Sequence, residues 1–132
     1  MIRLFILALL AATTANAEEN PFVEFKALKP EYSLRMAQVA MEYCQNEGFQ
    51  IGVMVTDRFG IPQVFLRDRY AGVHVFEMTE RKAWTAVTFR TATSELELLT
   101  QAGKELSAIR GLEKAMPVGG GLPVLDGDGS LV

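Results

Sequence analysis

The chain has 132 residues, 49% of them hydrophobic and 22% charged, and its formal net charge is −3. This length fits one domain, and the hydrophobic content is too high for a disordered chain. With 13 Lys and Arg against 16 Asp and Glu, and no run of basic residues, the composition argues against nucleic acid as a partner. One cysteine excludes an internal disulfide, and one histidine excludes a metal site built from several histidines of one subunit.

The start of the chain has the pattern of a signal peptide over residues 1–17. A single cation, Arg3, precedes an apolar run over residues 4–12, and an Ala-Asn-Ala sequence ends at Ala17, as at a signal-peptidase site. The apolar run is too short to span a membrane as a helix. The alternative is a buried N-terminal helix. We expect cleavage after Ala17 and a periplasmic or secreted domain over residues 18–132, without membrane insertion.

The first helix of this domain is expected to begin near Pro30, which suits a first helical turn, and to end at Gly48. Between them, apolar side chains recur at helical spacing, at Met36, Val39, Ala40 and Tyr43. Cys44 falls in the same pattern and is expected to be a small buried hydrophobic residue. In an oxidising compartment, an intermolecular disulfide or a thiolate ligand is the alternative for Cys44.

A β-hairpin is predicted next. Apolar residues alternate over 51–56, which predicts a half-buried strand, and residues 61–66 predict its partner. Residues 57–60 (DRFG) have the composition of a turn, in which Gly60 is free to take a positive φ. Because Pro62 lacks an N–H, we expect it where no ladder hydrogen bond is needed.

Two helices are predicted after the hairpin. The first covers about 75–90, with an apolar face formed by Phe76, Thr79, Ala83, Ala86 and Val87. The second begins at residues 94–97 (SELE), which match a capping box, because Ser94 can accept from the N–H of Glu97. This short helix is expected to end near Gly103.

The last part of the chain is rich in glycine and proline. Short strands are predicted over 116–118 and 122–125, on either side of residues 119–121 (GGG). These glycines permit close backbone approach or a strand bulge, and they lack the GxGxxG or GxxxxGK spacing of a nucleotide site. The predicted order of helix, two strands, two helices and strand indicates an α+β fold with an antiparallel sheet.

A few side chains are candidates for metal or haem chemistry. His74, just before the second helix, offers an imidazole that could ligate haem iron or another metal, or relay a proton; the alternative is an exposed histidine at a helix entry. Glu77 and Glu80 lie three residues apart, so their carboxylates share a helix face and could hold iron. The alternative for them is a solvated pair, neutralised by Arg81 and Lys82.

Thioether ligands are a further option, because methionine is an axial ligand in some haem proteins. The candidates, for which packing in the core is the alternative, are Met36, Met41, Met54 and Met78. Covalent attachment of a c-type haem is excluded, because the sequence has no CxxCH motif.

Five short motifs in order resemble the GlcG/HbpS-like haem-binding family. They are residues 53–60 (VMVTDRFG) for its VVDxxG turn, 82–86 (KAWTA) for its KA(Y/W)TA helix, 93–96 (TSEL) for TxEL, 119–124 (GGGLPV) for GGGVPI, and 126–127 (DG). Arg67 ends the second strand as the family's arginine does. The resemblance runs from about Pro30 to the end and assigns residues 18–132 to one GlcG/HbpS-like domain.

The resemblance implies a profilin-like fold, in which helices pack an antiparallel sheet, and assembly into homo-oligomers from dimers to octamers. It also implies haem binding in exported members. Family members continue into a glycine-rich strand where this chain stops at Val132. The last strand of the sheet is therefore expected to be missing, leaving an edge that a partner covers or that makes the domain less stable.

The chemistry of haem, taken together with the residues near His74 in the sequence, suggests which side chains would hold it. A porphyrin needs an apolar patch rimmed by cations, because it is a flat apolar ring with two propionates. The expected cofactor-binding residues are His74, Arg67, Arg69, Lys82, Trp84 and Thr85, with Arg81 and Tyr70 nearby, and iron is assigned to Glu77 and Glu80. The alternatives are helix packing for Trp84 and simple solvation for the cations.

The sequence therefore predicts an exported protein that binds haem or iron and sequesters, senses or delivers it without turnover. A membrane sensor or transporter is a candidate protein partner, and a third hypothesis is an oligomeric interaction module for a membrane sensor that binds no small molecule. The alternative is a periplasmic accessory protein or enzyme, acting in oxidation of small organic acids or alcohols or in haem degradation. A catalytic role would need a positioned acid–base pair, for which Asp57, Glu77, Glu80 and His74 are the candidates.

Overall fold

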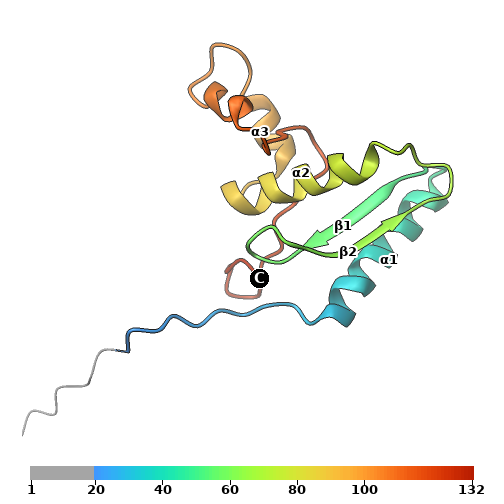
Figure 1. Cartoon of the computed structure of the whole chain (residues 1–132), viewed down its shortest axis with the longest axis horizontal. Helices are drawn as coiled ribbons and strands as arrows, with labels where there is room; N and C mark the ends of the chain where they lie inside the picture. The colour runs from blue at the N-terminus through green and yellow to red at the C-terminus, as the bar shows by residue number, and fades with distance from the viewer. Residues whose placement is uncertain (1–19) are drawn as a thin grey trace, which may run out of the picture.

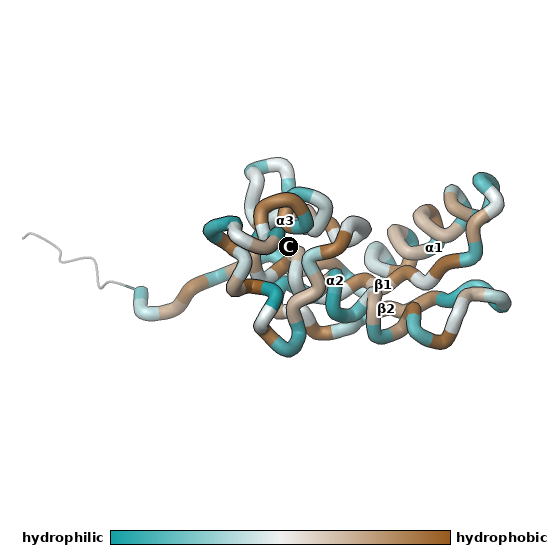
Figure 2. Tube along the Cα trace, turned by 90° about the horizontal axis from the view of Figure 1, so that it is seen from above, coloured by the Kyte–Doolittle hydropathy of each residue, from teal (hydrophilic) through white to brown (hydrophobic). Residues whose placement is uncertain are grey.

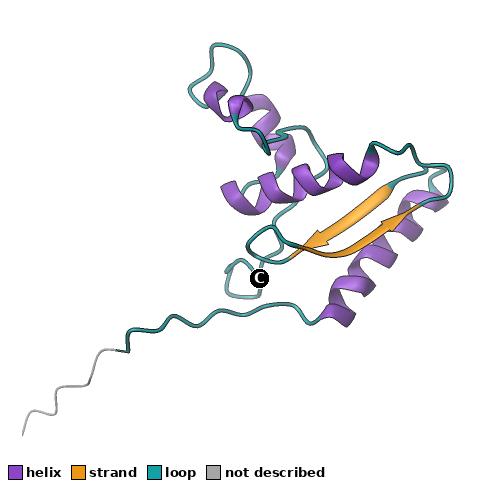
Figure 3. Ribbon diagram, viewed as in Figure 1, coloured by secondary structure: helices purple, strands orange, loops and turns teal. Residues whose placement is uncertain are grey.

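The computed structural model describes residues 20–132, so the predicted signal peptide lies outside the described residues. Three α-helices, two β-strands and a short 3-10 helix make up this part of the chain (Figure 3). In chain order they are α1 (Pro30–Asn46), β1 (Gly52–Thr56), β2 (Pro62–Arg67), α2 (Val75–Phe89), α3 (Thr93–Leu99) and η1 (Ser107–Gly111). This is the α+β fold predicted from the sequence. Among residues 20–132, no helix combines the length and hydropathy that crossing a membrane requires.

The predicted hairpin is confirmed. β1 and β2 pair antiparallel, with Gly52 opposite Arg67 and Val55 opposite Val64. The register shifts at the next pair, where Thr56 lies opposite Pro62, so β2 carries one extra residue there. Pro62 is the first residue of β2, a position where the missing N–H disturbs the ladder least.

The turn between the strands is organised by Asp57. Its Oδ1 accepts from the N–H of Phe59 at 2.8 Å and from that of Ile61 at 2.9 Å. Gly60 has φ +80°, as predicted, a value that side chains disfavour. The turn is thereby fixed by local bonds.

The hairpin lies between α1 and α2 (Figure 1). Toward α2, the rings of Phe65 and Phe76 meet edge to face, with centroids 4.9 Å apart. Toward α1, Ser33 Oγ donates to Gln63 Oε1 at 2.9 Å, and Ala37 is fully buried. Each helix thus packs against both strands of a small sheet.

The two long helices have the expected limits. α1 begins at Pro30 and ends at Asn46, and Gly48 follows with φ +83°. α2 ends at Phe89, and Arg90 takes the left-handed conformation that closes the helix, its N–H donating to the carbonyl of Ala86.

The predicted start of the third helix is wrong. α3 begins at Thr93, with Ala92 as its N-cap, and Ser94 makes no capping bond. The carboxylate of Glu97 accepts instead from the N–H of Gly119 at 3.0 Å. A long-range contact has therefore replaced the local capping box.

The two short strands predicted near the C-terminus are also wrong. Residues 116–118 and 122–125 form no strand, and the only β-type pairing in this region of the described chain is an isolated bridge between Leu125 and Leu131. The backbone of residues 116–121 bonds instead to side chains of α2 and α3, as described below, and the carbonyl of Val124 accepts from the N–H of Val132 within the C-terminal segment.

Most of the buried apolar residues are alanines, and many large apolar side chains are left exposed. The buried apolar residues are Ala37, Ala71, Ala86, Val87, Leu96, Ala115 and Leu131. On α1, Tyr32 and Tyr43 are 59% and 68% exposed. Near the C-terminus, Leu122 is 73% exposed. A hydrophobic stretch of the N-terminal arm (residues 20–29), brown in Figure 2, also stands clear of the folded part.

Candidate functional site: an apolar groove along β1

A cleft of about 440 Å³ runs along β1, between α1 and α2. Its fourth wall is the C-terminal segment, residues 120–132. The lining side chains, almost all apolar, include Met36 and Ala40 of α1, Val53 and Met54 of β1, Ala83 and Val87 of α2, and Leu122, Leu125 and Leu131 of the C-terminal segment. A cavity of about 270 Å³ continues it, sharing Met54 and Ala83 and adding Cys44 and Lys82. We call the two together the β1 groove.

The groove exists because β1 has a strand on one side only. In the described chain, the sheet consists of β1 and β2, so the outer edge of β1 has no strand partner. The helices extend past this edge, and small residues such as Ala40, Ala83 and Gly120 face the space. An apolar cleft beside an unpaired strand edge is a surface suited to an apolar ligand or to another extended chain.

Thr85 and Arg81, which lie one turn apart on α2, bind residues 113–116, the segment that leads to the fourth wall. Thr85 is fully buried, and its Oγ1 accepts from the N–H of Met116 at 2.8 Å. The Arg81 guanidinium donates to the carbonyls of Glu113 and Ala115, at 3.0 and 3.2 Å. These side chains anchor the segment to α2.

Lys82 makes the next contact along the same segment. Its Nζ donates to the carbonyl of Gly119 at 2.9 Å. An ammonium has three N–H donors, so this bond leaves capacity for a further acceptor. Because Lys82 also lines the continuation of the β1 groove, it places a positive charge at one end of that apolar space.

The glycine triplet ends in a tight backbone contact. The N–H of Gly121 donates to Thr93 Oγ1 at 2.7 Å, and the N–H of Thr93 donates to the carbonyl of Gly121 at 2.9 Å. A Cβ added at Gly121 would lie 2.5 Å from the carbonyl oxygen of Lys82. The close backbone approach predicted for these glycines is confirmed at Gly121.

The structure separates the residues that the sequence assigned to haem. Lys82 lines the groove, Thr85 is buried beneath the segment that it anchors, and Trp84 packs on the hairpin turn, where a Cβ at Gly60 would lie 2.7 Å from its Cδ1. His74 precedes Trp84 by ten residues, about 15 Å along a helix axis. As a set of haem contacts, these residues stay a prediction.

Arg67, Arg69 and His74 are exposed and lie around the loop that joins β2 to α2. The loop is held by Asp68, a residue that the sequence did not single out. Asp68 is 6% exposed, and its carboxylate accepts from Gln45 Nε2 and from the N–H of Ile51. The three basic residues thus lie in a solvated region at the end of the hairpin opposite Gly60, outside the lining of the β1 groove, and we call them the basic cluster.

Glu77 and Glu80 each face a cation. Glu77 Oε1 lies 3.3 Å from the guanidinium of Arg81, and Glu80 Oε1 lies 3.7 Å from Lys114 Nζ. Within residues 20–132, no three His, Cys, Asp or Glu side chains gather as a metal site would require. Binding of iron by the two glutamates stays a prediction.

Comparison with known proteins gives the family. A family model described as haem degrading protein HbpS-like matches residues 28–132. The chain belongs to the HbpS-like haem-degrading protein family. The resemblance seen in the sequence motifs is thereby confirmed, for nearly all of the described residues.

Solved structures similar to this chain share its fold. HbpS itself is 29% identical, with a TM-score of 0.77 over 87% of this chain and 79% of HbpS. A PduOC–haem complex is 33% identical, with a TM-score of 0.68 over 80% of this chain and 78% of that one. The corrinoid adenosyltransferase PduO of Salmonella typhimurium is 34% identical over 92 residues, 66% of this chain but 26% of PduO. The chain thus spans about a quarter of the length of PduO.

Proposed function

We propose that this HbpS-like protein binds haem outside the cytoplasm and sequesters, senses or delivers it without turnover. The observation that carries the proposal is the likeness to the PduOC–haem complex, at 33% identity over 80% of the chain. The family match over residues 28–132 supports it further.

The β1 groove has the chemistry that haem requires. Its apolar walls suit the ring, and Met36 and Met54 bring thioethers, which can serve as axial ligands, into the lining. At one end, Lys82 offers N–H donors for a propionate. Bound haem would supply an iron centre able to take such a ligand. We therefore place haem in the groove, with Met36, Met54 and Lys82 as its contacts.

The second placement is the basic cluster of Arg67, Arg69 and His74 that the sequence indicated. It offers an imidazole and two guanidinium groups, but its apolar neighbours Tyr70 and Val73 are 82% and 88% exposed. An exposed patch of this kind removes little of the ring from water. The groove is therefore favoured.

Titration of the purified protein with hemin tests the function. A saturable Soret band at one hemin per subunit is expected. A linear rise without saturation, equal to that of hemin in buffer, would contradict haem binding. Adding a reductant to the complex then separates storage from degradation: a stable Soret band is expected for binding without turnover, and its loss with release of iron would show degradation.

Export and partners are part of the same proposal. The predicted leader, with Arg3 and a cleavage site after Ala17, supports a periplasmic or secreted location. N-terminal sequencing of protein recovered from the periplasm or medium should begin at Glu18. The family resemblance also supports a homo-oligomer and a membrane sensor or transporter as receiver of the ligand, which gel filtration and crosslinking in cells would test.

A further inference from the structure

The fourth wall of the β1 groove is packed into the core at Leu131 but makes hydrogen bonds to the rest of the described chain at only two places. At its start, Gly121 bonds to Thr93, as described above. Farther on, residues 125–131 form a C-terminal turn, closed by the bridge between Leu125 and Leu131. Within the described chain, hydrogen bonds from residues 122–132 to any other segment come from one side chain, that of Lys26. Beyond Gly121, the polar attachment of this wall to the rest of the described chain therefore depends on the arm that carries Lys26.

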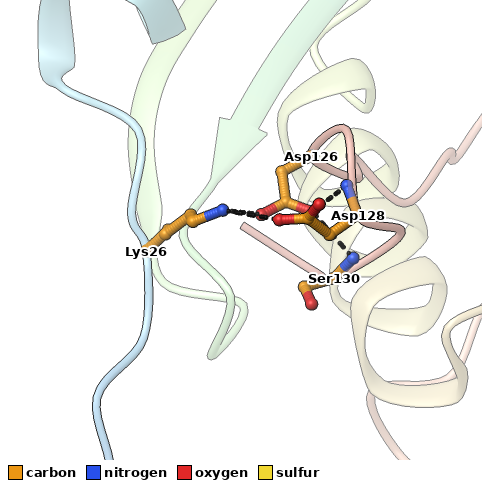
Figure 4. A network of polar contacts seen from close by, with 4 residues as sticks. All are labelled: Lys26, Asp126, Asp128 and Ser130. Carbon is orange, nitrogen blue, oxygen red and sulfur yellow. Dashed lines mark hydrogen bonds and ion pairs between the residues drawn. The ribbon is translucent and has the colours of Figure 1, made fainter.

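The polar contact of the N-terminal arm, residues 20–29, is a lysine between two aspartates. Lys26 Nζ lies 2.7 Å from Asp126 Oδ2 and 3.0 Å from Asp128 Oδ2 (Figure 4). Asp126 also shapes the turn itself, since its Oδ1 accepts from the N–H groups of Asp128 and Ser130, both at 2.9 Å. One carboxylate thus joins the arm to the C-terminal turn.

The arm has an apolar contact one residue earlier. Phe25 meets Phe59 edge to face, with ring centroids 5.4 Å apart, and the guanidinium of Arg58 lies 4.7 Å from the centre of the Phe25 ring. Arg58 and Phe59 belong to the turn between β1 and β2. The arm therefore ties the hairpin turn to the C-terminal turn, which no other hydrogen bond or ion pair in the described chain does.

We infer that the N-terminal arm is a releasable strap that holds the fourth wall of the β1 groove in place. The strap lies at the end of the groove where Asp57 and Leu131 are lining residues. Phe25 and Lys26 are 52% and 67% exposed, so water and salt reach both contacts. Exposed ion pairs are weak and screened by salt, so the strap opens readily. When it opens, residues 122–132 keep no hydrogen bond to the rest of the described chain and only packing such as that of Leu131 holds them, so the C-terminal turn moves away from β1 more often and admits or releases a ligand.

Hydrogen exchange tests the strap directly. The full protein is compared with Lys26→Met, which removes the ammonium but keeps the length of the side chain. Amides of Asp128, Ser130 and Val132 should exchange about fivefold faster in this variant, because the turn opens more often. Lys29→Met, on the same arm at a lysine without an ion pair in the described chain, should exchange at the wild-type rate.

The dependence of exchange on salt is the second part of the experiment. Raising the ionic strength should speed exchange in the wild type toward the rate of Lys26→Met, and should leave Lys26→Met unchanged. Equal exchange rates in the wild type and Lys26→Met at low salt would overturn the inference. So would equal acceleration by Lys26→Met and Lys29→Met, because the arm would then act without its ion pairs.

The effect on ligand release rests on the proposed function. Transfer of hemin from the protein to apomyoglobin should be several-fold faster for Lys26→Met than for the wild type. If hemin does not bind, the proposed function fails, whereas the exchange experiment still decides whether the strap exists. If hemin binds and leaves both proteins at one rate while exchange differs, the strap does not gate the groove.

Discussion

Thr93 and Gly121 hold each other by three hydrogen bonds that join the start of α3 to the end of the glycine triplet. Two were given above, and in the third Thr93 Oγ1 donates to the carbonyl of Gly121 at 3.3 Å. Thr93 is fully buried and Gly121 is buried. This pair fixes both the first residue of α3 and the place where the fourth wall of the β1 groove begins.

Thr93→Val should therefore destabilise the protein. The substitution keeps the shape of the side chain but leaves the buried N–H of Gly121 without its acceptor, at a cost of about 2 kcal/mol. Ser94→Ala is the control, because a true capping box would lose about 1 kcal/mol and this serine makes no cap. Urea unfolding measures both. Equal losses for the two variants would contradict the assignment of the helix start.

Gly121→Ala should be more damaging than Gly119→Ala. A Cβ at Gly121 meets backbone atoms of Lys82 at 2.5 Å, whereas the nearest atom to a Cβ at Gly119 is 3.5 Å away. The first clash cannot be relieved by turning a side chain, so we expect a loss of about 3 kcal/mol, against under 1 kcal/mol for Gly119→Ala. Thermal unfolding of both variants measures the difference, and similar melting temperatures would contradict the close approach.

The contacts of Thr93 and Gly121 also show which parts of the structure local sequence patterns can predict. The hairpin, α1 and α2 were predicted because alternation, helical spacing and turn residues are local patterns. The predicted capping box is wrong because a long-range contact sets the start of α3. Thr93 bonds to Gly121, which lies 28 positions away in the sequence. Lys82 and Thr85 were found through their motif, but their bonds to Gly119 and Met116 were not, because spacing along a helix does not say which distant backbone it meets.

The groove and the strap could not be predicted from local patterns, because both depend on contacts between residues far apart in the sequence. Lys26 and Asp126 are 100 residues apart in the chain. Asp126 was singled out only for its DG motif, and no pattern pointed to Lys26. Met36 and Met54 were proposed as ligands from their chemistry, and only the packing of α1 beside β1 brings them to one cleft.

The pH dependence of the strap follows from its two charges. The Lys26 ammonium, together with the N–H of Ser130, holds the pKa of Asp126 below its usual value of 3.8. Hydrogen bonds to Asp126 and Asp128 raise the pKa of Lys26 above its usual 10.5. The contribution of Asp126 is present above pH 3.8 and lost as the pH falls through its lowered pKa. That of Lys26 is present below pH 10.5 and lost as the pH rises through its raised pKa.

Carboxyl NMR titration checks this. The pKa of Asp126 should lie below 3.8 in the wild type and closer to 3.8 in Lys26→Met. In that variant, Arg58 is the remaining cation in the lining of the cavity that also holds Asp126, Asp128 and Glu24. An Asp126 pKa that does not change in Lys26→Met would contradict the ion pair.

The location of haem can be decided by comparing variants. Met36→Leu combined with Met54→Leu keeps the groove apolar but removes both thioethers, so we expect about tenfold weaker hemin binding and a shifted Soret maximum. Met78→Leu, at a methionine outside the groove lining, is the matched control. If instead His74→Ala abolishes the shift and the double variant binds like the wild type, haem lies at the basic cluster.

The absorption spectrum of the protein purified from its native compartment, before and after addition of hemin, is the most direct measurement of haem binding. Haem binding predicts a Soret band that is present on isolation or saturates at one hemin per subunit and remains after gel filtration. A protein that is colourless and still colourless after hemin addition and gel filtration would contradict it.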